Sequence, residues 1–324
     1  MVQPLDSPPN VFMFAGQGSQ YFQMGRELFD AGGEFAHWMR YLDRCLQKTA
    51  GLSVVAALYG NQKRSEPFVD TLLTHPAIFM LEVALAKELL SRDVHADITL
   101  GVSMGSFAAA VIADCLSAEY ALDLVVTQAE EFSRHCAKGT MIAILANESL
   151  HREEPLRSRS VIASHNFESH FVLSTMAQHC DSIVEFLKGR GVSHQVLPVA
   201  FAFHSPWIGG AKRSFEAAVR RLTARSSSIP VACCATATLL ADLPAGFFWD
   251  AVEKPIRFRD TITALETSGP HRYLDVGAAG TLAGLLRYIL PSSSRSAATP
   301  ILNPFGRDLH NLESVARLFA GGRS

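Results

Sequence analysis

The residues with the clearest chemical potential form the pentapeptide Gly101-Val102-Ser103-Met104-Gly105, which fits the pattern G-x-S-x-G. In this pattern a serine occupies a sharp turn between a strand and a helix, so its hydroxyl is lifted above the edge of the sheet. The following helix N-terminus favours negative charge that develops beside it. The segment Asp97-Ile98-Thr99-Leu100 predicts a short strand, and the alanine-rich run 106–111 predicts the helix. Ser103 is therefore a candidate nucleophile, and a purely structural glycine turn is the alternative.

A serine nucleophile needs a base, and the chain contains 12 histidines. His204 stands out because it follows the apolar stretch 201–203, where a small inserted region is expected to rejoin the core. A lone histidine there also fits a structural role. A lipase-like chain order Ser…Asp…His instead favours a late histidine together with an acid, namely His271 or His310 with Asp275 or Asp250.

A glycine-rich loop follows the first predicted strand. The apolar run 11–14 is closed by Gly16-Gln17-Gly18-Ser19-Gln20. This loop has no phosphate-binding lysine and does not fit G-x-G-x-x-G, which argues against a nucleotide site. Such a loop can instead present a backbone N–H to an oxyanion, and losing one such donor costs about 10²–10³ in rate.

The elements that must position these residues alternate between strands and helices, which predicts a parallel α/β core. Helices are expected near 22–48 and over 77–91, the second opening at Pro76. The pattern changes after about residue 138. Short strands are predicted at 140–145, 160–163, 171–174 and 193–198, with a helix at 181–188 and an exposed connection at 148–159. This pattern suggests a small α+β insert over 138–202, and the core resumes with a strand and glycine turn at 273–277.

Composition excludes several classes of protein. A chain of 324 residues that is 48% hydrophobic, with a formal net charge of -2, buries a sizeable core and is not disordered. It also lacks a net basic footprint for nucleic acid. The six cysteines include no C-x-x-C pair, so neither a zinc site nor any other metal site is expected. No secretory signal and no run of about 20 apolar residues is visible, so we expect a soluble, cytoplasmic protein without a membrane segment.

Five segments in a fixed order resemble the malonyl-CoA:acyl-carrier-protein transacylases and polyketide-synthase acyltransferases. They are the opening segment Phe12–Gly25 (FMFAGQGSQYFQMG), His75–Phe79, the pentapeptide 101–105, Phe203-His204-Ser205, and Lys254–Phe258. The resemblance covers nearly the whole chain. It implies an α/β fold in which an α/β-hydrolase-like parallel-sheet core (1–137 and 203–324) carries a small ferredoxin-like α+β subdomain (138–202).

The resemblance also implies roles for individual residues. Ser103 would be the nucleophile and His204 its base, with a backbone carbonyl near Asp250-Ala251 orienting the histidine, so that no acidic third member is required. The backbone N–H groups of Gln17 and Met104 would form the oxyanion hole. The remaining substrate-binding candidates in the cleft are Val102, Phe203, Asn166 and Gln128.

Three positions depart from the family pattern, which usually reads G-H-S-x-G-E at the serine turn. Val102 replaces the histidine, Ser106 replaces the glutamate, and Gln128 stands where malonyl-specific members carry an arginine. That arginine would pair with the free carboxylate of a malonyl group. A neutral glutamine cannot form this charged bond. If its loss weakens binding of malonyl by about 3 kcal/mol, malonyl is disfavoured roughly 10²-fold relative to an uncharged acyl group. We therefore expect uncharged acyl groups, such as acetyl or longer chains, to be preferred; a neutral replacement on a helix face is the alternative.

A subgroup with glutamine at this position resembles the chain and is associated with removing acyl groups from carrier proteins. The sequence therefore predicts a serine-dependent acyl hydrolase of a trans-acyltransferase polyketide pathway, acting on acyl carrier proteins as a monomer. No cofactor is expected, because the phosphopantetheine of the carrier protein, or CoA, brings the acyl group. The alternatives are an acyltransferase that loads a carrier protein and a non-catalytic carrier-binding protein. Basic side chains on one helical side form either a solvated face or a docking surface for an acidic carrier protein; they are Lys212, Arg213, Arg220 and Arg221.

Overall fold

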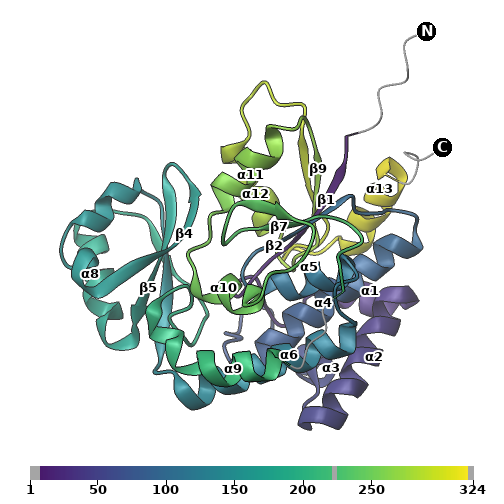
Figure 1. The fold of residues 1–324 in the computed structure, drawn as a ribbon, viewed down its shortest axis with the longest axis horizontal. Coiled ribbons are helices and arrows are strands. Elements are labelled where there is room, and N and C mark those ends of the chain that lie inside the picture. The colour runs from purple at the N-terminus through teal and green to yellow at the C-terminus, as the bar shows by residue number, and fades with distance from the viewer. Residues whose placement is uncertain (1–7, 221–224, 320–324) are drawn as a thin grey trace.

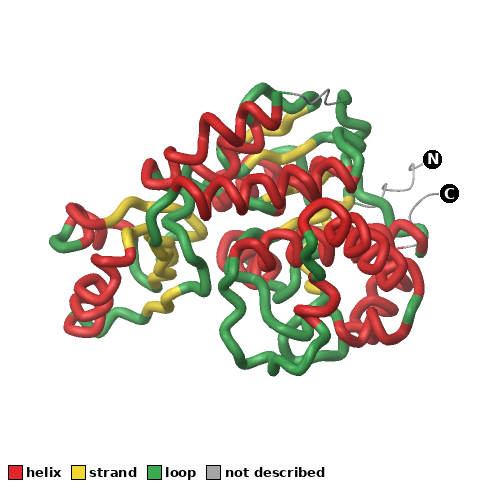
Figure 2. Tube along the Cα trace, turned by 90° about the horizontal axis from the view of Figure 1, so that it is seen from below, coloured by secondary structure: helices red, strands yellow, loops and turns green. Residues whose placement is uncertain are grey.

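The computed structural model describes residues 8–220 and 225–319, and their strands form two separate sheets. Figure 1 shows the smaller sheet, with β4, β5 and α8, projecting to one side of a larger body that contains β1, β2 and β9. The helices of that body enclose its strands, as the tube view in Figure 2 shows. The fold is the α/β class predicted from the sequence.

The larger sheet has six strands in the order β10-β9-β1-β2-β7-β8. All of its pairings are parallel except that between β7 and β8. The strands are β1 (Asn10–Phe14), β2 (Ile98–Gly101), β7 (Val231–Cys233), β8 (Thr238–Leu240), β9 (Arg272–Asp275) and β10 (Ala297–Pro300).

Strand β1 is fully buried because helices cover both faces of the sheet. Phe12 and Phe14 point into one apolar cluster, and Val11 and Met13 point into the other. The helices are α1 (Arg26–Ala31), α2 (Gly33–Ala50), α3 (Val54–Leu58), α4 (Thr71–Ser91), α5 (Gly105–Ile112), α6 (Ala118–His135), α7 (Leu156–Arg159), α8 (Cys180–Gly189), α9 (Lys212–Val219), α10 (Phe247–Glu253), α11 (Phe258–Glu266), α12 (Thr281–Ile289) and α13 (Asp308–Phe319).

The smaller sheet is antiparallel and has the order β4-β5-β3-β6. Its strands are β3 (Gly139–Ile144), β4 (Ser160–Phe167), β5 (His170–Met176) and β6 (His194–Val196). The chain order strand–helix–strand–strand–helix–strand is that of a ferredoxin-like unit. A separate apolar cluster fills it, with Ile142, Phe171, Leu173, Ile183 and Leu187 among its members. All four strands lie between residues 139 and 196, and the exact division at 138 and 202 stays a prediction.

The smaller sheet is tied to loops of the larger body beside His204. Ile256 donates its N–H to the Ala163 carbonyl at 2.8 Å, and His165 donates its N–H to the Ile256 carbonyl at 2.9 Å. The Ser174 hydroxyl of β5 also donates to the carbonyl of Phe203. The loop after α10 therefore extends along β4.

Three expectations about local structure were wrong. Helix α4 begins at Thr71 rather than after Pro76, because the Asp70 side chain caps the Leu72 N–H at 3.1 Å. The predicted helix at 22–48 is divided into α1 and α2 at Gly32, which has a positive φ of 86°. The connection 148–159 is not simply exposed, because it contains η1 (Glu148–Arg152) and α7, which buries Leu156.

In the part of the chain that the structure describes, every helix is too short or too polar to cross a membrane. The same residues include no group of three or more His, Cys, Asp or Glu side chains placed to hold a metal ion.

Candidate active site

The serine turn is built by close contacts that only glycine permits. Ser103 lies between β2 and α5 with a positive φ of 56°, a strained conformation for a residue with a side chain. A Cβ on Gly105 would lie 2.3 Å from the Phe14 carbonyl oxygen, and one on Gly101 would lie 2.4 Å from the Ser106 Cα. The strand and the helix therefore meet closely enough to hold the hydroxyl in one place.

Ser103 and His204 form a hydrogen-bonded pair although 101 positions separate them. The Ser103 Oγ lies 2.8 Å from the His204 Nε2, and the His204 Nδ1 lies 2.8 Å from the Lys254 carbonyl oxygen. A carbonyl can only accept, so Nδ1 carries the proton and Nε2 is free to accept from the serine hydroxyl. Burial lowers the pKa of His204 to about 4, which keeps the ring neutral at pH 7. This is the arrangement of a nucleophile and its general base.

The carbonyl that orients His204 belongs to Lys254, a few residues beyond Asp250-Ala251, near which it was expected. Helix α10 explains the difference, because the Asp250 carbonyl already accepts the Lys254 N–H at 3.0 Å. Lys254 is the first residue after the helix, so its own carbonyl is free for the imidazole. The backbone N–H of His204 donates to the Val252 carbonyl at 2.8 Å and holds the residue at its positive φ of 59°.

The glycine loop after β1 lies directly against the serine. A Cβ on Gly16 would lie 2.8 Å from the Ser103 Cβ. The Gln17 side chain donates to the Thr74 Oγ1 at 2.9 Å and to the His75 Nδ1 at 2.5 Å, which anchors the loop to α4. Met104 follows Ser103 directly in the chain, and Gln17 follows Gly16, which lies against the serine. No hydrogen bond to another described residue occupies the backbone N–H group of either residue. Their role as an oxyanion hole stays a prediction.

Ser103 and His204 open into a cleft of about 340 Å³ between the two sheets. Val102, Phe203 and Asn166 line it, as the sequence suggested. The large-sheet side also contributes Gly16, Gln17, Ile256, Phe258 and residues of α12, and the small sheet contributes Met141, Ala143, Ser164, His170, Val172 and Gln195. Apart from the histidines, no ionisable side chain lines this cleft within the described residues.

A comparison with known protein families shows to which family the chain belongs. The family described as "Acyl transferase domain" matches residues 11–320. The chain belongs to the acyl transferase domain family. A polyketide biosynthesis acyltransferase homolog, BaeD of Bacillus velezensis, is 40% identical over 309 residues, covering 95% of both chains. The homolog PksD of Bacillus subtilis is 39% identical with the same coverage.

Solved structures show the same fold for this acyl transferase domain. The acyltransferase domain from the second module of the salinomycin polyketide synthase superposes with a TM-score of 0.84 at 26% identity, covering 98% of this chain and 75% of that one. A malonyl-CoA:acyl carrier protein transacylase from Xanthomonas oryzae has a TM-score of 0.82 at 23% identity, with 97% and 99% covered.

The alternative catalytic residues of this acyl transferase domain lie elsewhere. His271 is buried, with its Nδ1 3.6 Å from the Glu266 carboxylate, and His310 is exposed on α13. Asp275 accepts the N–H groups of Gly277 and Ala283 at the end of β9, and Asp250 pairs with the Lys254 side chain. None of these four residues lines the cleft that holds Ser103.

Gln128 does not line the cleft, contrary to the expectation that it contacts substrate. The residue is fully buried on α6, and its amide nitrogen lies 3.5 Å from the Phe248 carbonyl oxygen on α10. Phe203 does line the cleft and packs against Phe132 and His75, with ring centroids 5.2 and 5.7 Å apart. The ring of Phe203, rather than the glutamine amide, therefore borders the cleft on this side.

Sequence reasoning missed Glu82, a carboxyl group buried in the apolar helix α4. Its Oε1 accepts the N–H of Ala15 at 2.6 Å, immediately before the glycine loop. Burial raises the pKa of Glu82 well above its usual range. The signal was a single acid within the apolar run 77–86, which a core position tolerates only with a hydrogen-bond partner.

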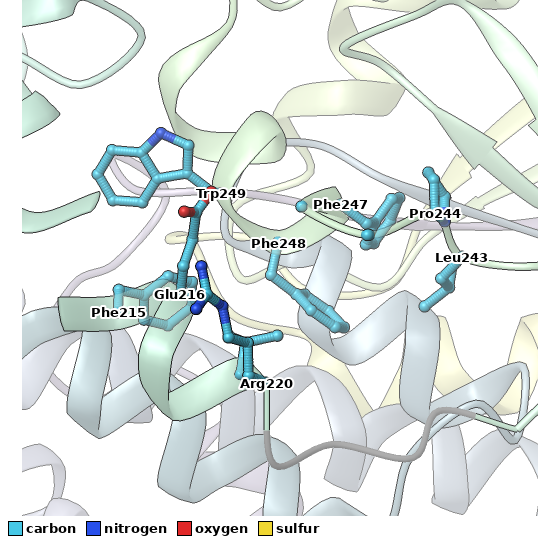
Figure 3. Close-up of a pocket in the computed structure, with 11 residues that line it drawn as sticks. Phe215, Glu216, Arg220, Leu243, Pro244, Phe247, Phe248 and Trp249 are labelled. Carbon is cyan, nitrogen blue, oxygen red and sulfur yellow. The ribbon is translucent and has the colours of Figure 1, made fainter. Parts of the chain in front are cut away.

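A second cavity, of about 450 Å³, lies between α9 and α10 and is shown in Figure 3. Phe215, Phe247, Phe248 and Trp249 line it together with Glu216 and Arg220. It contains neither a serine nor a histidine among its lining residues, so its size does not make it the catalytic site. On the same helix α9, Lys212 binds Glu253 at 3.3 Å rather than standing free, and Arg221 lies outside the described residues.

Proposed function

We propose that the protein hydrolyses thioesters that link uncharged acyl groups, acetyl or longer, to acyl carrier proteins in a polyketide pathway. The observation that carries this proposal is the Ser103–His204 pair in a cleft without a lysine or arginine among its described lining residues. A malonyl carboxylate brought into this cleft would lose its hydration without gaining a cationic partner. An acetyl or alkyl group would lose much less.

The chemistry proceeds in two halves. The Ser103 Oγ attacks the thioester carbonyl while the His204 Nε2 accepts its proton, and the backbone N–H groups of Gln17 and Met104 bind the oxyanion. The C–S bond then breaks, and His204 returns the proton to the leaving thiol. In the second half His204 deprotonates a water molecule, which attacks the Ser103 ester. The ester C–O bond breaks, His204 returns the proton to the Ser103 Oγ, and the free acid leaves. The Lys254 carbonyl stabilises the imidazolium that forms in each half.

Acyl transfer is the second candidate, and the names of the relatives favour it. BaeD and PksD are both described as polyketide biosynthesis acyltransferase homologs. In this version the thiol of a second carrier protein, or of CoA, replaces water in the second half. The protein then needs no cofactor of its own, because the phosphopantetheine thiol belongs to the substrate. The acyl-Ser103 intermediate is common to both candidates.

A mass-spectrometric time course separates the two candidates. Acetyl- and malonyl-loaded carrier proteins are each incubated with the enzyme, with and without a second, unloaded carrier protein. We expect free acetate with little acetyl on the acceptor, slow loss of malonyl, and no reaction with Ser103→Ala. Acyl accumulating on the acceptor would make the protein a transferase, and faster loss of malonyl than acetyl would contradict the selectivity.

The Gln128→Arg variant tests whether position 128 acts on the acyl group at all. Because malonyl-specific members of the family carry an arginine at this position, we expect Gln128→Arg to gain malonyl turnover. The wild-type side chain is buried and turned toward Phe248. If Gln128→Arg gained no malonyl turnover, the preference for uncharged acyl groups would come from the uncharged lining of the cleft alone. Gln128→Met, which has a similar volume and no charge, is the matched control.

A further inference from the structure

Three polar side chains on the small sheet form a hydrogen-bonded chain along the wall of the cleft. The Ser164 Oγ donates to the Asn166 Oδ1 at 2.6 Å, and the Asn166 Nδ2 lies 2.9 Å from the His170 Nδ1. All three residues line the cleft that contains Ser103. Ser164 and Asn166 are buried, whereas His170 is only partly buried.

These distances determine which nitrogen of His170 carries the proton. A separation of 2.6 Å is usual for O–H···O and short for N–H···O, so the Asn166 oxygen faces Ser164 and its NH₂ group faces His170. The amide nitrogen can only donate, so the His170 Nδ1 accepts and the proton of the neutral ring lies on Nε2. Burial lowers the pKa of His170, which favours the neutral ring. The Nε2–H has no hydrogen-bond partner among the residues that the structure describes.

The ring plane of His170 is held by aromatic stacking. Phe167 stacks on His170 with centroids 5.1 Å apart, and on Tyr288 of α12 with centroids 4.6 Å apart. The pairing of β4 with β5 shifts register between Ile162 and Ser164 and again before Phe167. Such irregularities re-aim side chains near functional sites. Hydrogen bonding fixes the tautomer of His170 and stacking fixes the plane of its ring. The imidazole therefore presents one N–H donor, at Nε2, in a defined direction.

We propose that the Nε2–H of His170 binds a carbonyl oxygen of the acyl-pantetheine substrate and so determines which thioesters are bound productively. The proposal deepens the proposed function, because both place an acyl-pantetheine in this cleft. A neutral donor in an otherwise uncharged cleft suits a neutral acceptor. Such acceptors occur in the amides of the pantetheine arm and at the 3-position of an oxidised acyl chain. His170 is a binding residue and takes no part in proton transfer at Ser103.

Paired variants separate the donor from the shape of the side chain. His170→Gln keeps an N–H donor at a similar reach, whereas His170→Phe keeps a stacked ring and removes the donor. His165→Phe is the matched control, since His165 lies on β4, pairs with Glu148 and does not line the cleft. The substrates are butyryl-pantetheine, 3-oxobutyryl-pantetheine and S-ethyl thiobutyrate, the last of which lacks any amide.

We expect His170→Phe to lower kcat/KM about tenfold on the substrate that carries the acceptor and less than twofold on S-ethyl thiobutyrate. His170→Gln should retain most of the activity. Loss with both pantetheine esters assigns the acceptor to the arm, and loss with the 3-oxo ester alone assigns it to the acyl chain. Equal loss on all three substrates, equal loss in both variants, or no loss would overturn the proposal.

A binding measurement keeps this inference separate from the proposed function. Calorimetry with the Ser103→Ala protein and butyryl- or 3-oxobutyryl-pantetheine reports affinity without turnover. We expect His170→Phe in this background to weaken binding of the ester that carries the acceptor about tenfold. If the wild-type protein turned over no thioester while this effect persisted, the proposed function would fail and the binding role would stand. Turnover without any effect of His170 on binding would overturn the binding role and leave the proposed function intact.

Discussion

The two walls of the cleft are built in different ways. On the large-sheet wall the proposed catalytic pair is held by backbone: Ser103 and His204 both have positive φ, and the Lys254 carbonyl orients the imidazole. On the small-sheet wall, Ser164, Asn166 and His170 are held by side-chain hydrogen bonds and stacking. The first wall carries the proposed nucleophile and base, and the second carries neutral groups suited to binding.

This difference predicts which residues of the cleft tolerate substitution and which do not. A backbone-held nucleophile tolerates few substitutions, because neighbouring carbonyls lie within 3 Å of where a Cβ would stand. A side-chain network can be altered one residue at a time without moving the strands that carry it. Substitutions in the first wall should therefore change whether the reaction occurs, and substitutions in the second should change which substrate reacts.

The largest effect is expected from His204→Ala. Without the base, the Ser103 hydroxyl keeps its proton, and formation of the acyl-enzyme should slow by about 10³–10⁴-fold. Pre-steady-state mass spectrometry of acetyl-Ser103 measures this directly. The matched control is His271→Ala, a buried histidine outside the cleft, which should keep the acylation rate of any folded protein near wild type. Comparable acylation by the two variants would remove His204 from the mechanism.

Replacing one glycine by alanine in each of the two regions should change the free energy of unfolding in different directions. A Cβ at Gly105 would meet the Phe14 and Ala15 carbonyl oxygens at 2.3 and 2.5 Å, so Gly105→Ala should lower the free energy of unfolding by about 3 kcal/mol. Gly189 ends α8 of the small sheet, with open space around it, so Gly189→Ala should be neutral or slightly stabilising. Urea unfolding of both variants measures the contrast, and similar losses would contradict it.

The buried acids make the large-sheet side sensitive to pH. Burial raises the pKa of Glu82, so its stabilising contribution is complete below about pH 4.5 and is lost as the pH rises toward the folded-state pKa. Glu82→Gln abolishes this titration and can still accept the Ala15 N–H. The stability of the variant relative to wild type should therefore increase with pH, by up to about 1.4 kcal/mol per unit above pH 5.

Urea midpoints between pH 4 and 8 test this dependence on Glu82. Glu168→Gln removes an exposed acid at the tip of the β4–β5 hairpin and serves as the matched control. A difference between Glu82→Gln and wild type that does not change with pH would show that the carboxyl group is ionised in the folded protein.

The sequence predicted the backbone-held wall much better than the other. The G-x-S-x-G pattern marks a turn where only certain residues fit, so Ser103 could be named in advance, and the resemblance of F-H-S to the family motif named His204. The carbonyl at Lys254 could not, because it depends on where α10 ends. The orientation of the Gln128 amide could not either, since it follows from the packing of α6 against α10. His170 went unnoticed because its role arises from the β4–β5 register, which no local pattern encodes.

The smallest effect is expected from Asp250→Asn, which tests whether a backbone carbonyl suffices to orient His204. In a Ser-His-Asp triad, replacing the acid by its amide costs about 10⁴ in kcat. Here Asp250 only forms a half-exposed ion pair with the Lys254 side chain, so turnover should stay within about twofold and stability within about 1 kcal/mol. Steady-state kinetics with acetyl carrier protein measures the first quantity. A loss of turnover above 100-fold would indicate that Asp250 acts as an acidic third member of the site. The Lys254 carbonyl would then not be the only group that orients the imidazole.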